Sequence, residues 1–146
     1  MLKLPPPIWA LVYVLACAAV SALLGWPAGL HVPLLGIALT LLGFAPPAAA
    51  ILLFRREDTE IQPTSPTNKA LVTEGPYRFT RNPMYLGLVI ITFGIALWIG
   101  SWPMLLAPAL LFATTNFVHI PFEEAKMRRQ FGDAFKVYLR RVRRWI

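Results

Sequence analysis

Four long apolar runs alternate with polar segments along the chain. The runs cover residues 8–24, 32–54, 85–99 and 104–120, and every Asp, Glu, Lys and Arg lies outside them. Uncharged apolar runs of about this length are typical of transmembrane helices. The pattern therefore predicts an all-α, polytopic membrane protein with four transmembrane helices, built as a single domain over residues 1–146.

Composition supports a membrane protein and excludes other classes. The 146 residues are 57% hydrophobic and only 14% charged, which excludes a disordered chain. The net charge of +7 is compatible with nucleic acid, but basic segments of membrane proteins more often contact anionic lipid headgroups, so we expect lipid and no nucleic acid. The single cysteine, Cys17, provides neither a disulfide nor a thiolate cluster. The first run has features of a signal peptide, but it stays apolar beyond Cys17, so we expect a retained span.

The distribution of cations predicts the orientation. The connections 25–31 and 100–103 contain no Lys or Arg, whereas the segment 55–83 contains five and the part from Glu123 onward contains eight. Cytoplasmic loops carry the excess of Lys and Arg, so both termini and the connecting loop 59–84 are expected on the cytoplasmic side. The short connection 100–103 also predicts that the last two spans form an antiparallel hairpin.

The basic tail, residues 123–143, has the pattern of an amphipathic helix that lies on the membrane surface. Its apolar positions recur at helical spacing: Met127, Phe131, Phe135, Tyr138 and Val142. Cationic residues occupy mostly the other faces: Arg128, Arg129, Lys136, Arg140 and Arg144. Gly132 weakens this helix locally and permits a sharp turn.

One cluster of polar residues precedes the third span, within residues 71–85. Gly75-Pro76 and Asn82-Pro83 are turn signals, so a loop with exposed backbone groups should lead into the helix. Such a helix start beside Arg81 can bind a carboxylate or phosphate. Equally, Arg78 and Arg81 can anchor the chain to lipid phosphates. Both interpretations remain open at this point.

A second polar cluster ends the fourth span. Asn116, His119 and Glu123 are spaced by three and four residues, so their side chains share one helical face. A histidine and a carboxylate at membrane depth are costly unless they are used or paired. The structural alternative is that Glu123 and Glu124 pair with Arg128 or with cations of the middle loop. No metal site is predicted, because no cysteine is near and the other histidine should lie on the opposite side.

The predicted hairpin places the two polar clusters at the same face of the membrane. Asn82 and Tyr85 should then lie beside His119 and Glu123. We expect a pocket with apolar walls and a basic mouth, open to the membrane between the spans. Such a pocket suits a small polar cofactor and a lipophilic substrate.

The ordered set of motifs resembles the isoprenylcysteine carboxyl methyltransferase family, which is related to the membrane phospholipid methyltransferases. The resemblance covers about residues 59–142 and is carried by Gln62, Lys69-Ala70-Leu71-Val72-Thr73, Gly75-Pro76-Tyr77, Arg81-Asn82-Pro83-Met84-Tyr85, Glu123-Glu124, Phe131-Gly132 and Tyr138. It implies an integral membrane enzyme that uses S-adenosylmethionine, releases S-adenosylhomocysteine and takes a lipophilic substrate from the bilayer. The cofactor contacts it implies are Gln62, Lys69, Ala70, Leu71, Val72, Tyr77, Asn82, Pro83, Met84, Tyr85 and Glu123. Backbone groups near Leu71 and Val72 would bind the adenine edge.

Two positions depart from the family pattern. Asn82 stands where the family has the histidine of Arg-His-Pro, and His119 stands where the prenylcysteine enzymes have an arginine suited to the substrate carboxylate. The acceptor group therefore stays open among carboxyl, amine and thiol. An amine or thiol must lose a proton, so we predict that His119 is catalytic, orienting or deprotonating the acceptor, and that His119 and Asn116 bind substrate.

Two other function classes compete with methyl transfer. The alternative is a non-catalytic membrane scaffold whose basic helix binds anionic lipid or a partner protein, and this scaffold would bind no cofactor. A transporter or channel subunit is disfavoured, because no charged residue lies within any span to mark an ion path.

Overall fold

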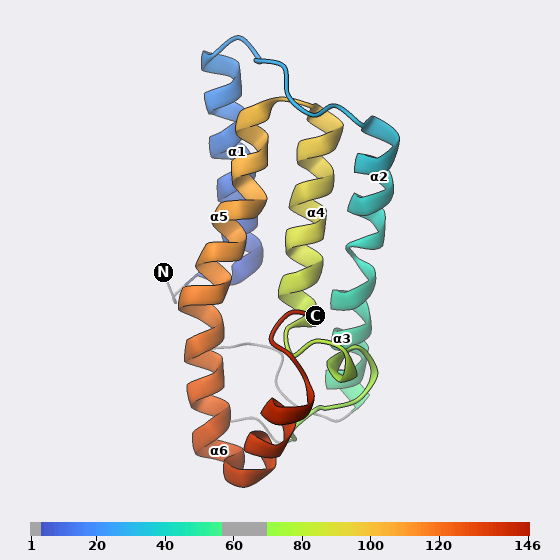
Figure 1. Ribbon diagram of the computed structural model, residues 1–146, viewed down its shortest axis with the longest axis vertical. Helices are drawn as coiled ribbons and strands as arrows, with labels where there is room; N and C mark the ends of the chain where they lie inside the picture. The colour runs from blue at the N-terminus through green and yellow to red at the C-terminus, as the bar shows by residue number, and fades with distance from the viewer. Residues whose placement is uncertain (1–3, 57–69) are drawn as a thin grey trace.

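The computed structural model describes residues 4–56 and 70–146, and within them every regular element is helical. The elements in chain order are α1 (Pro6–Leu23), α2 (Pro33–Leu42), α3 (Ala45–Arg56), the 3-10 turn η1 (Gly75–Arg78), α4 (Pro83–Ile99), the 3-10 turn η2 (Trp102–Leu105), α5 (Leu106–Thr114), the π-helical turn η3 (Thr115–His119) and α6 (Ile120–Arg141). The predicted all-α class is confirmed. In Figure 1 the apolar helices stand side by side as one bundle.

Three helical stretches are long and apolar enough to cross a membrane: Pro6–Leu23, Pro33–Arg56 and Trp102–Arg141. The predicted third span is the shorter apolar helix Pro83–Ile99, with 17 residues. The helix of the second stretch is interrupted between Leu42 and Ala45, where α2 ends and α3 begins. Pro46 and Pro47 lie in the first turn of α3, where the missing N–H groups cost little. The four apolar helices therefore agree with the predicted spans, and the interruption lies just ahead of the prolines.

Helix α4 packs closely against α2 through glycines on both helices. A Cβ atom built on Gly94 would lie 2.5 Å from Thr40 Oγ1 and 2.6 Å from the Gly36 carbonyl oxygen. A Cβ on Gly36 would lie 2.6 Å from the Trp98 backbone nitrogen. Only glycine permits the two backbones to approach this closely. This contact fixes one side of α4 and leaves its first turn free to face the site.

The two connections that contain no cations meet at one end of the bundle. Gly29 N–H donates to the Gly100 carbonyl at 2.7 Å, and the Ser101 hydroxyl donates to the Pro27 carbonyl at 3.0 Å. Gly100 has a φ of 74°, the left-handed conformation that ends α4 and starts the hairpin turn. The ends of α3 and α6 lie at the opposite end of the bundle (Figure 1). The hairpin prediction is confirmed, and the cationic segments among the described residues lie together.

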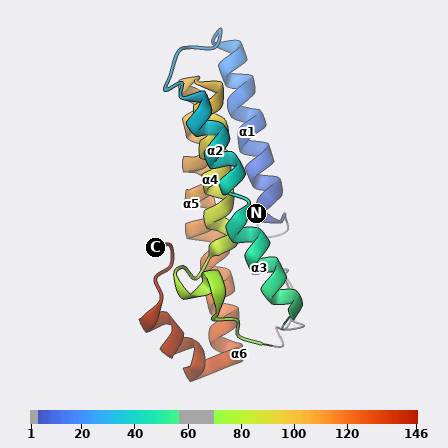
Figure 2. The ribbon, with the colours of Figure 1, turned by 90° about the vertical axis from the view of Figure 1, so that its right-hand side faces the viewer.

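The C-terminal helix differs from the predicted separate element over 123–143. It begins at Ile120 and continues directly from α5 through the π-helical turn η3. Pro121 lacks an N–H, and its ring would clash with an ordinary preceding turn, which the wider π-helical turn relieves. The helix then breaks at Gly132, with φ 48° and ψ −119°, and the chain folds back toward the start of α4 (Figure 2).

Candidate functional site

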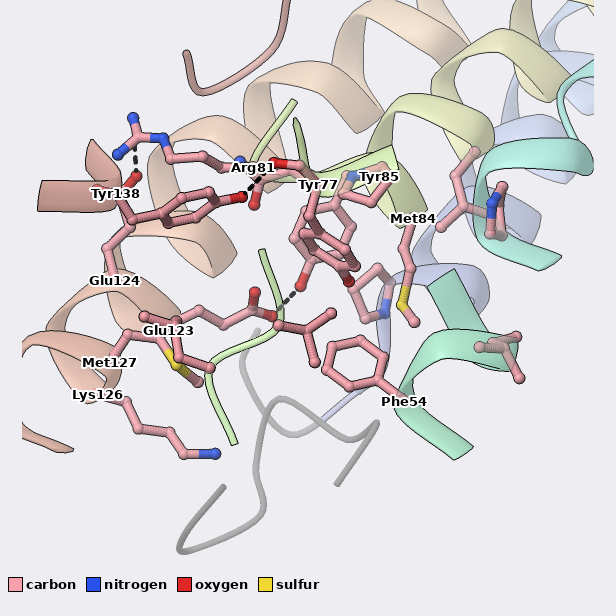
Figure 3. A pocket seen from close by; sticks show the side chains of 18 of the residues that line it. Phe54, Tyr77, Arg81, Met84, Tyr85, Glu123, Glu124, Lys126, Met127 and Tyr138 are labelled. Carbon is pink, nitrogen blue, oxygen red and sulfur yellow. Dashed lines mark hydrogen bonds and ion pairs between the residues drawn. The ribbon is translucent and has the colours of Figure 1, made fainter. Parts of the chain in front are cut away.

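A cavity of about 350 Å³ lies at the cationic end of the bundle, between α3, the segment before α4, the first turn of α4, and α6. Figure 3 shows it from close by. Its lining residues are Pro5, Pro6, Pro7, Pro47, Ile51, Phe54, Ala70, Leu71, Val72, Tyr77, Arg81, Asn82, Pro83, Met84, Tyr85, Leu88, Glu123, Glu124, Lys126, Met127, Phe135 and Tyr138. Most of the wall is apolar, so its few polar groups decide what the cavity binds.

A hydrogen bond joins α4 to α6 in the wall of the cavity. The Tyr85 hydroxyl donates to Glu123 Oε1, and Figure 3 shows the two side chains pointing toward one another. Tyr85 is only 5% exposed, so water competes poorly for this bond. The prediction that the start of the third span lies beside Glu123 is confirmed. The chain thus fixes the Glu123 carboxylate in a wall that is mostly apolar.

Aromatic side chains form a second part of the wall. The rings of Phe54 and Tyr77 meet edge to face with centroids 5.6 Å apart. The Tyr138 hydroxyl donates to the Tyr77 carbonyl at 2.8 Å, which ties the folded-back half of α6 to η1. Burial, with a contribution from Glu123, raises the pKa of the Tyr77 phenol well above its usual range. Tyr77 therefore presents a neutral aromatic surface.

Two arginines share one carboxylate at the edge of the cavity. Arg81 Nη2 lies 3.3 Å from Glu124 Oε1, and Arg144 Nη2 lies 2.9 Å from Glu124 Oε2. Burial lowers the pKa of the Arg81 guanidinium, while the Glu124 carboxylate acts in the opposite direction. The structural alternative is therefore correct for Glu124, which pairs with a cation of the middle loop. Arg81 is engaged inside the protein, whereas Arg78 is exposed.

The structure places most of the predicted cofactor residues around this one cavity. Those that line it are Ala70, Leu71, Val72, Tyr77, Asn82, Pro83, Met84, Tyr85 and Glu123. Gln62 and Lys69 lie outside the described residues. The Asn82 side-chain nitrogen is already engaged, because it donates to the Arg144 carbonyl at 2.8 Å. Asn82 therefore contributes to the cavity wall with its amide group committed elsewhere.

The two predicted substrate residues lie near the cavity but do not line it. Asn116 Oδ1 accepts from Trp145 Nε1 at 3.0 Å and from Arg144 Nη1 at 3.4 Å. His119 is 2% exposed, and its ring centroid lies 6.3 Å from that of Tyr85. His119 Nδ1 lies 3.4 Å from the Thr114 carbonyl oxygen, and Nε2 has no hydrogen-bond partner among the described residues. His119 therefore does not line the cavity itself but lies next to Tyr85, which does.

Several lining residues were not predicted as site residues. They are Pro5, Pro6, Pro7, Pro47, Ile51, Phe54, Arg81, Leu88, Glu124, Lys126, Met127, Phe135 and Tyr138. The helical periodicity of the tail marked three of these as one apolar face, but it could not show that this face folds back over the cavity. That return depends on the turn at Gly132. Among residues 4–56 and 70–146, no group of three His, Cys, Asp or Glu could hold a metal ion.

A largely apolar, partly aromatic cavity that holds the Glu123 carboxylate suits a particular kind of guest. Aromatic faces and a carboxylate both favour a ligand that combines a flat ring with a cationic group. The volume lies at the lower end of pockets that hold a small organic molecule or cofactor.

Comparisons with known proteins agree with this chemistry. The chain is 33% identical over 63 residues to an uncharacterized protein of Haemophilus influenzae, covering 43% of this chain and 100% of that protein. It is 37% identical over 70 residues to methanethiol S-methyltransferase 1 of Bradyrhizobium diazoefficiens, covering 45% of this chain and 22% of the enzyme. It is 32% identical over 72 residues to protein-S-isoprenylcysteine O-methyltransferase of Schizosaccharomyces pombe, covering 49% and 30% respectively. The matched regions thus span less than a third of either named enzyme, and no solved structure matches.

The family itself is identified by a longer match. Residues 32–134 match the sequence profile of the phospholipid methyltransferases, and this range includes α2, α3, α4, α5 and most of α6. It also contains Tyr85, Glu123 and most of the cavity wall. Because the match covers more than half of the chain, this protein belongs to the phospholipid methyltransferase family, the membrane methyltransferases that also resemble the isoprenylcysteine enzymes.

Proposed function

We propose that the protein transfers a methyl group from S-adenosylmethionine to a lipophilic small molecule or lipid-like acceptor at the cytoplasmic face of a membrane. The observation that carries the proposal is the Tyr85–Glu123 hydrogen bond in the wall of a cavity of about 350 Å³. Family membership supports methyl transfer as the reaction. S-adenosylmethionine is the cofactor that the family resemblance implies, and the acceptor group stays open among carboxyl, amine and thiol.

The residues of the cavity fit this cofactor. Glu123 offers a fixed carboxylate to the cationic ammonium and sulfonium groups. The aromatic pair Phe54 and Tyr77 offers a surface to the adenine ring. Backbone groups near Leu71 and Val72 would bind the adenine edge, as the family resemblance implies. The turn from Asn82 to Tyr85, together with Glu123, would hold the methionine part.

The cofactor supplies a methyl group that is already activated on a sulfonium, so the chain mainly has to align the reactants and exclude water. Tyr85 holds the Glu123 carboxylate in one orientation. The apolar wall formed by Phe135, Met127 and Val72 keeps water from the reacting groups.

The acceptor side of the cavity is entirely apolar. Pro5, Pro6 and Pro7 at the start of α1 line it together with Pro47 and Ile51 of α3. This surface suits a lipophilic acceptor that arrives from the bilayer. A carboxylate acceptor needs no base, whereas an amine or thiol must lose a proton. The resemblance to a methanethiol S-methyltransferase is a reason to include thiols.

We infer that His119 orients or deprotonates the acceptor. Its Nδ1 faces the Thr114 carbonyl, which favours a proton on that nitrogen and leaves Nε2 as a hydrogen-bond acceptor. This role requires the acceptor to reach past the ring of Tyr85. Asn116 would contact the acceptor from the same helical turn as His119, although its side-chain oxygen already accepts a hydrogen bond from Trp145.

The exposed cations of α6 suit the anionic cytoplasmic leaflet. They include Arg128, Arg129, Lys136 and Arg140. Because cytoplasmic segments carry the excess of positive charge, we propose that both termini and the cavity face the cytoplasm and that these side chains bind lipid headgroups.

Calorimetric titration with S-adenosylhomocysteine tests the proposal directly. The purified wild-type chain in nanodiscs should bind it, and Glu123→Gln should weaken binding by about tenfold or more, since hydrogen bonds to charged groups contribute about 1.5–3 kcal/mol. Asp133→Asn is the matched control, because Asp133 is an exposed acid on the same helix. Absence of binding by the wild type would contradict the cofactor assignment. Equal binding by wild type and Glu123→Gln would contradict the role of Glu123.

A further inference from the structure

The last five residues, 142–146, form a strap that crosses the start of α4. Helix α6 ends at Arg141, and Val142 is extended, with φ −122° and ψ 132°. Arg81 N–H donates to the Arg143 carbonyl at 3.0 Å. The Arg144 carbonyl accepts from the Thr80 hydroxyl at 3.1 Å and from Asn82 Nδ2 at 2.8 Å. Figure 2 shows the strap returning from the lower end of α6 toward this segment.

The side chains of the strap attach it to the other half of the hairpin. Arg144 contacts Glu124 with two nitrogens, Nη2 to Oε2 at 2.9 Å and Nε to Oε1 at 3.3 Å. Trp145 donates from Nε1 to Asn116 Oδ1 at 3.0 Å. The Trp145 ring also lies 4.7 Å from that of Phe112, centroid to centroid. The strap therefore contacts both sides of the hairpin at the end where the cavity lies.

Arg144 is the residue in which these contacts converge. Its carbonyl holds the turn before α4, and its guanidinium holds Glu124 of α6 and approaches Asn116 of η3. Glu124 lines the cavity and also pairs with Arg81, which lines it too. One carboxylate thus lies between two guanidinium groups, and both of its oxygens are engaged. Held in this way, Glu124 has a fixed orientation in the cavity wall.

We propose that Arg144 is a positioning residue for methyl transfer: through Glu124 and Arg81 it fixes the wall against which the cofactor binds. This inference rests on the proposed function. It also explains why Asn82 and Asn116, two residues expected to contact ligands, direct their amide groups to the strap.

The test compares binding of S-adenosylhomocysteine by wild type, Arg144→Gln and Arg141→Gln. Arg141 is exposed and loses the same charge on substitution, so it is the matched control. Arg144→Gln should weaken binding by about tenfold or more, because it removes a bidentate, partly buried contact. Arg144→Lys keeps the positive charge but cannot contact Glu124 with two nitrogens, so its affinity should lie between those of Arg144→Gln and the wild type. Arg141→Gln should bind as the wild type does.

A double-mutant cycle separates positioning from a merely structural role. If Arg144 acts through Glu124, Arg144→Gln should weaken binding much less when Glu124→Gln is already present. Equal losses in both backgrounds would overturn the proposal. Thermal unfolding of each variant is measured in parallel. Should Arg144→Gln fail to fold, Trp145→Phe takes its place, since it removes one hydrogen bond to Asn116 and should weaken binding about 2- to 12-fold.

The outcomes distinguish this inference from the proposed function. If the wild type does not bind S-adenosylhomocysteine, the proposed function fails and the positioning role fails with it. If the wild type binds and Arg144→Gln or Trp145→Phe binds equally well, only the positioning role is wrong.

Discussion

Replacing Tyr85 by phenylalanine removes a single oxygen atom from the site. The ring stays in place, but Glu123 loses its hydroxyl donor in a wall where Tyr85 is 5% exposed. A hydrogen bond to a charged group contributes about 1.5–3 kcal/mol, and burial keeps water from replacing it. At about 1.4 kcal/mol per factor of ten, binding of S-adenosylhomocysteine to Tyr85→Phe should be about 10- to 150-fold weaker.

The assay is calorimetric titration of the purified protein, with the midpoint of thermal unfolding measured on the same samples. Tyr13→Phe is the matched control: it loses a hydroxyl that lies 2.6 Å from Thr114 Oγ1, between α1 and α5 and away from the cavity. This control should lose about 0.5–1.5 kcal/mol of stability with unchanged affinity. If Tyr85→Phe binds the ligand as tightly as Tyr13→Phe, the hydroxyl does not set the geometry of Glu123 and the reasoning is refuted.

Three further predictions concern the acceptor and the fold. Turnover of His119→Gln should fall by about 10²- to 10⁴-fold with an amine or thiol acceptor at unchanged cofactor affinity, and normal turnover in a rate assay would exclude the role of the histidine. Gly94→Leu should lower the free energy of unfolding by about 1–3 kcal/mol or more, because a side chain there meets Thr40 and the α2 backbone. A denaturation midpoint equal to that of the wild type would show that α2 and α4 can move apart to admit the side chain. Gly132→Ala should cost about 1–3 kcal/mol, because φ 48° with ψ −119° strains any residue with a Cβ, although the space there is open; a thermal midpoint equal to the wild type would mean that the turn can adopt another conformation.

Much of the fold follows from the sequence, because lipid imposes simple rules. Uncharged runs predicted the apolar helices, and the four-residue connection 100–103 predicted the hairpin. From the hairpin alone it follows that Tyr85 and Glu123 meet, and the structure confirms it. These predictions depend only on length, polarity and chain connectivity.

What could not be predicted depends on contacts between distant residues. Gly132 is compatible with a weakened helix and with a sharp turn, and only tertiary packing, such as the Tyr138–Tyr77 bond, selects the turn. The strap is held partly by backbone carbonyls, which leave no pattern in a sequence, and Asn82 donates to one of them. Asn116 accepts from the side chains of Arg144 and Trp145, and this contact depends on the turn at Gly132 that brings the distant tail back. The π-helical turn beside Pro121 is equally invisible to helical periodicity.

The glycine contact between α2 and α4 has a consequence for how acceptor preference can diverge among relatives. Because backbone meets backbone at Gly94 and Gly36, α4 cannot shift sideways to admit a bulkier molecule. On the proposed function, a change in the size of the acceptor side then has to come from the part of the wall that Pro5 to Pro7 and Ile51 line. Substitutions meant to change acceptor specificity are best made at the start of α1, where side chains of another size leave the pairing of Tyr85 with Glu123 undisturbed.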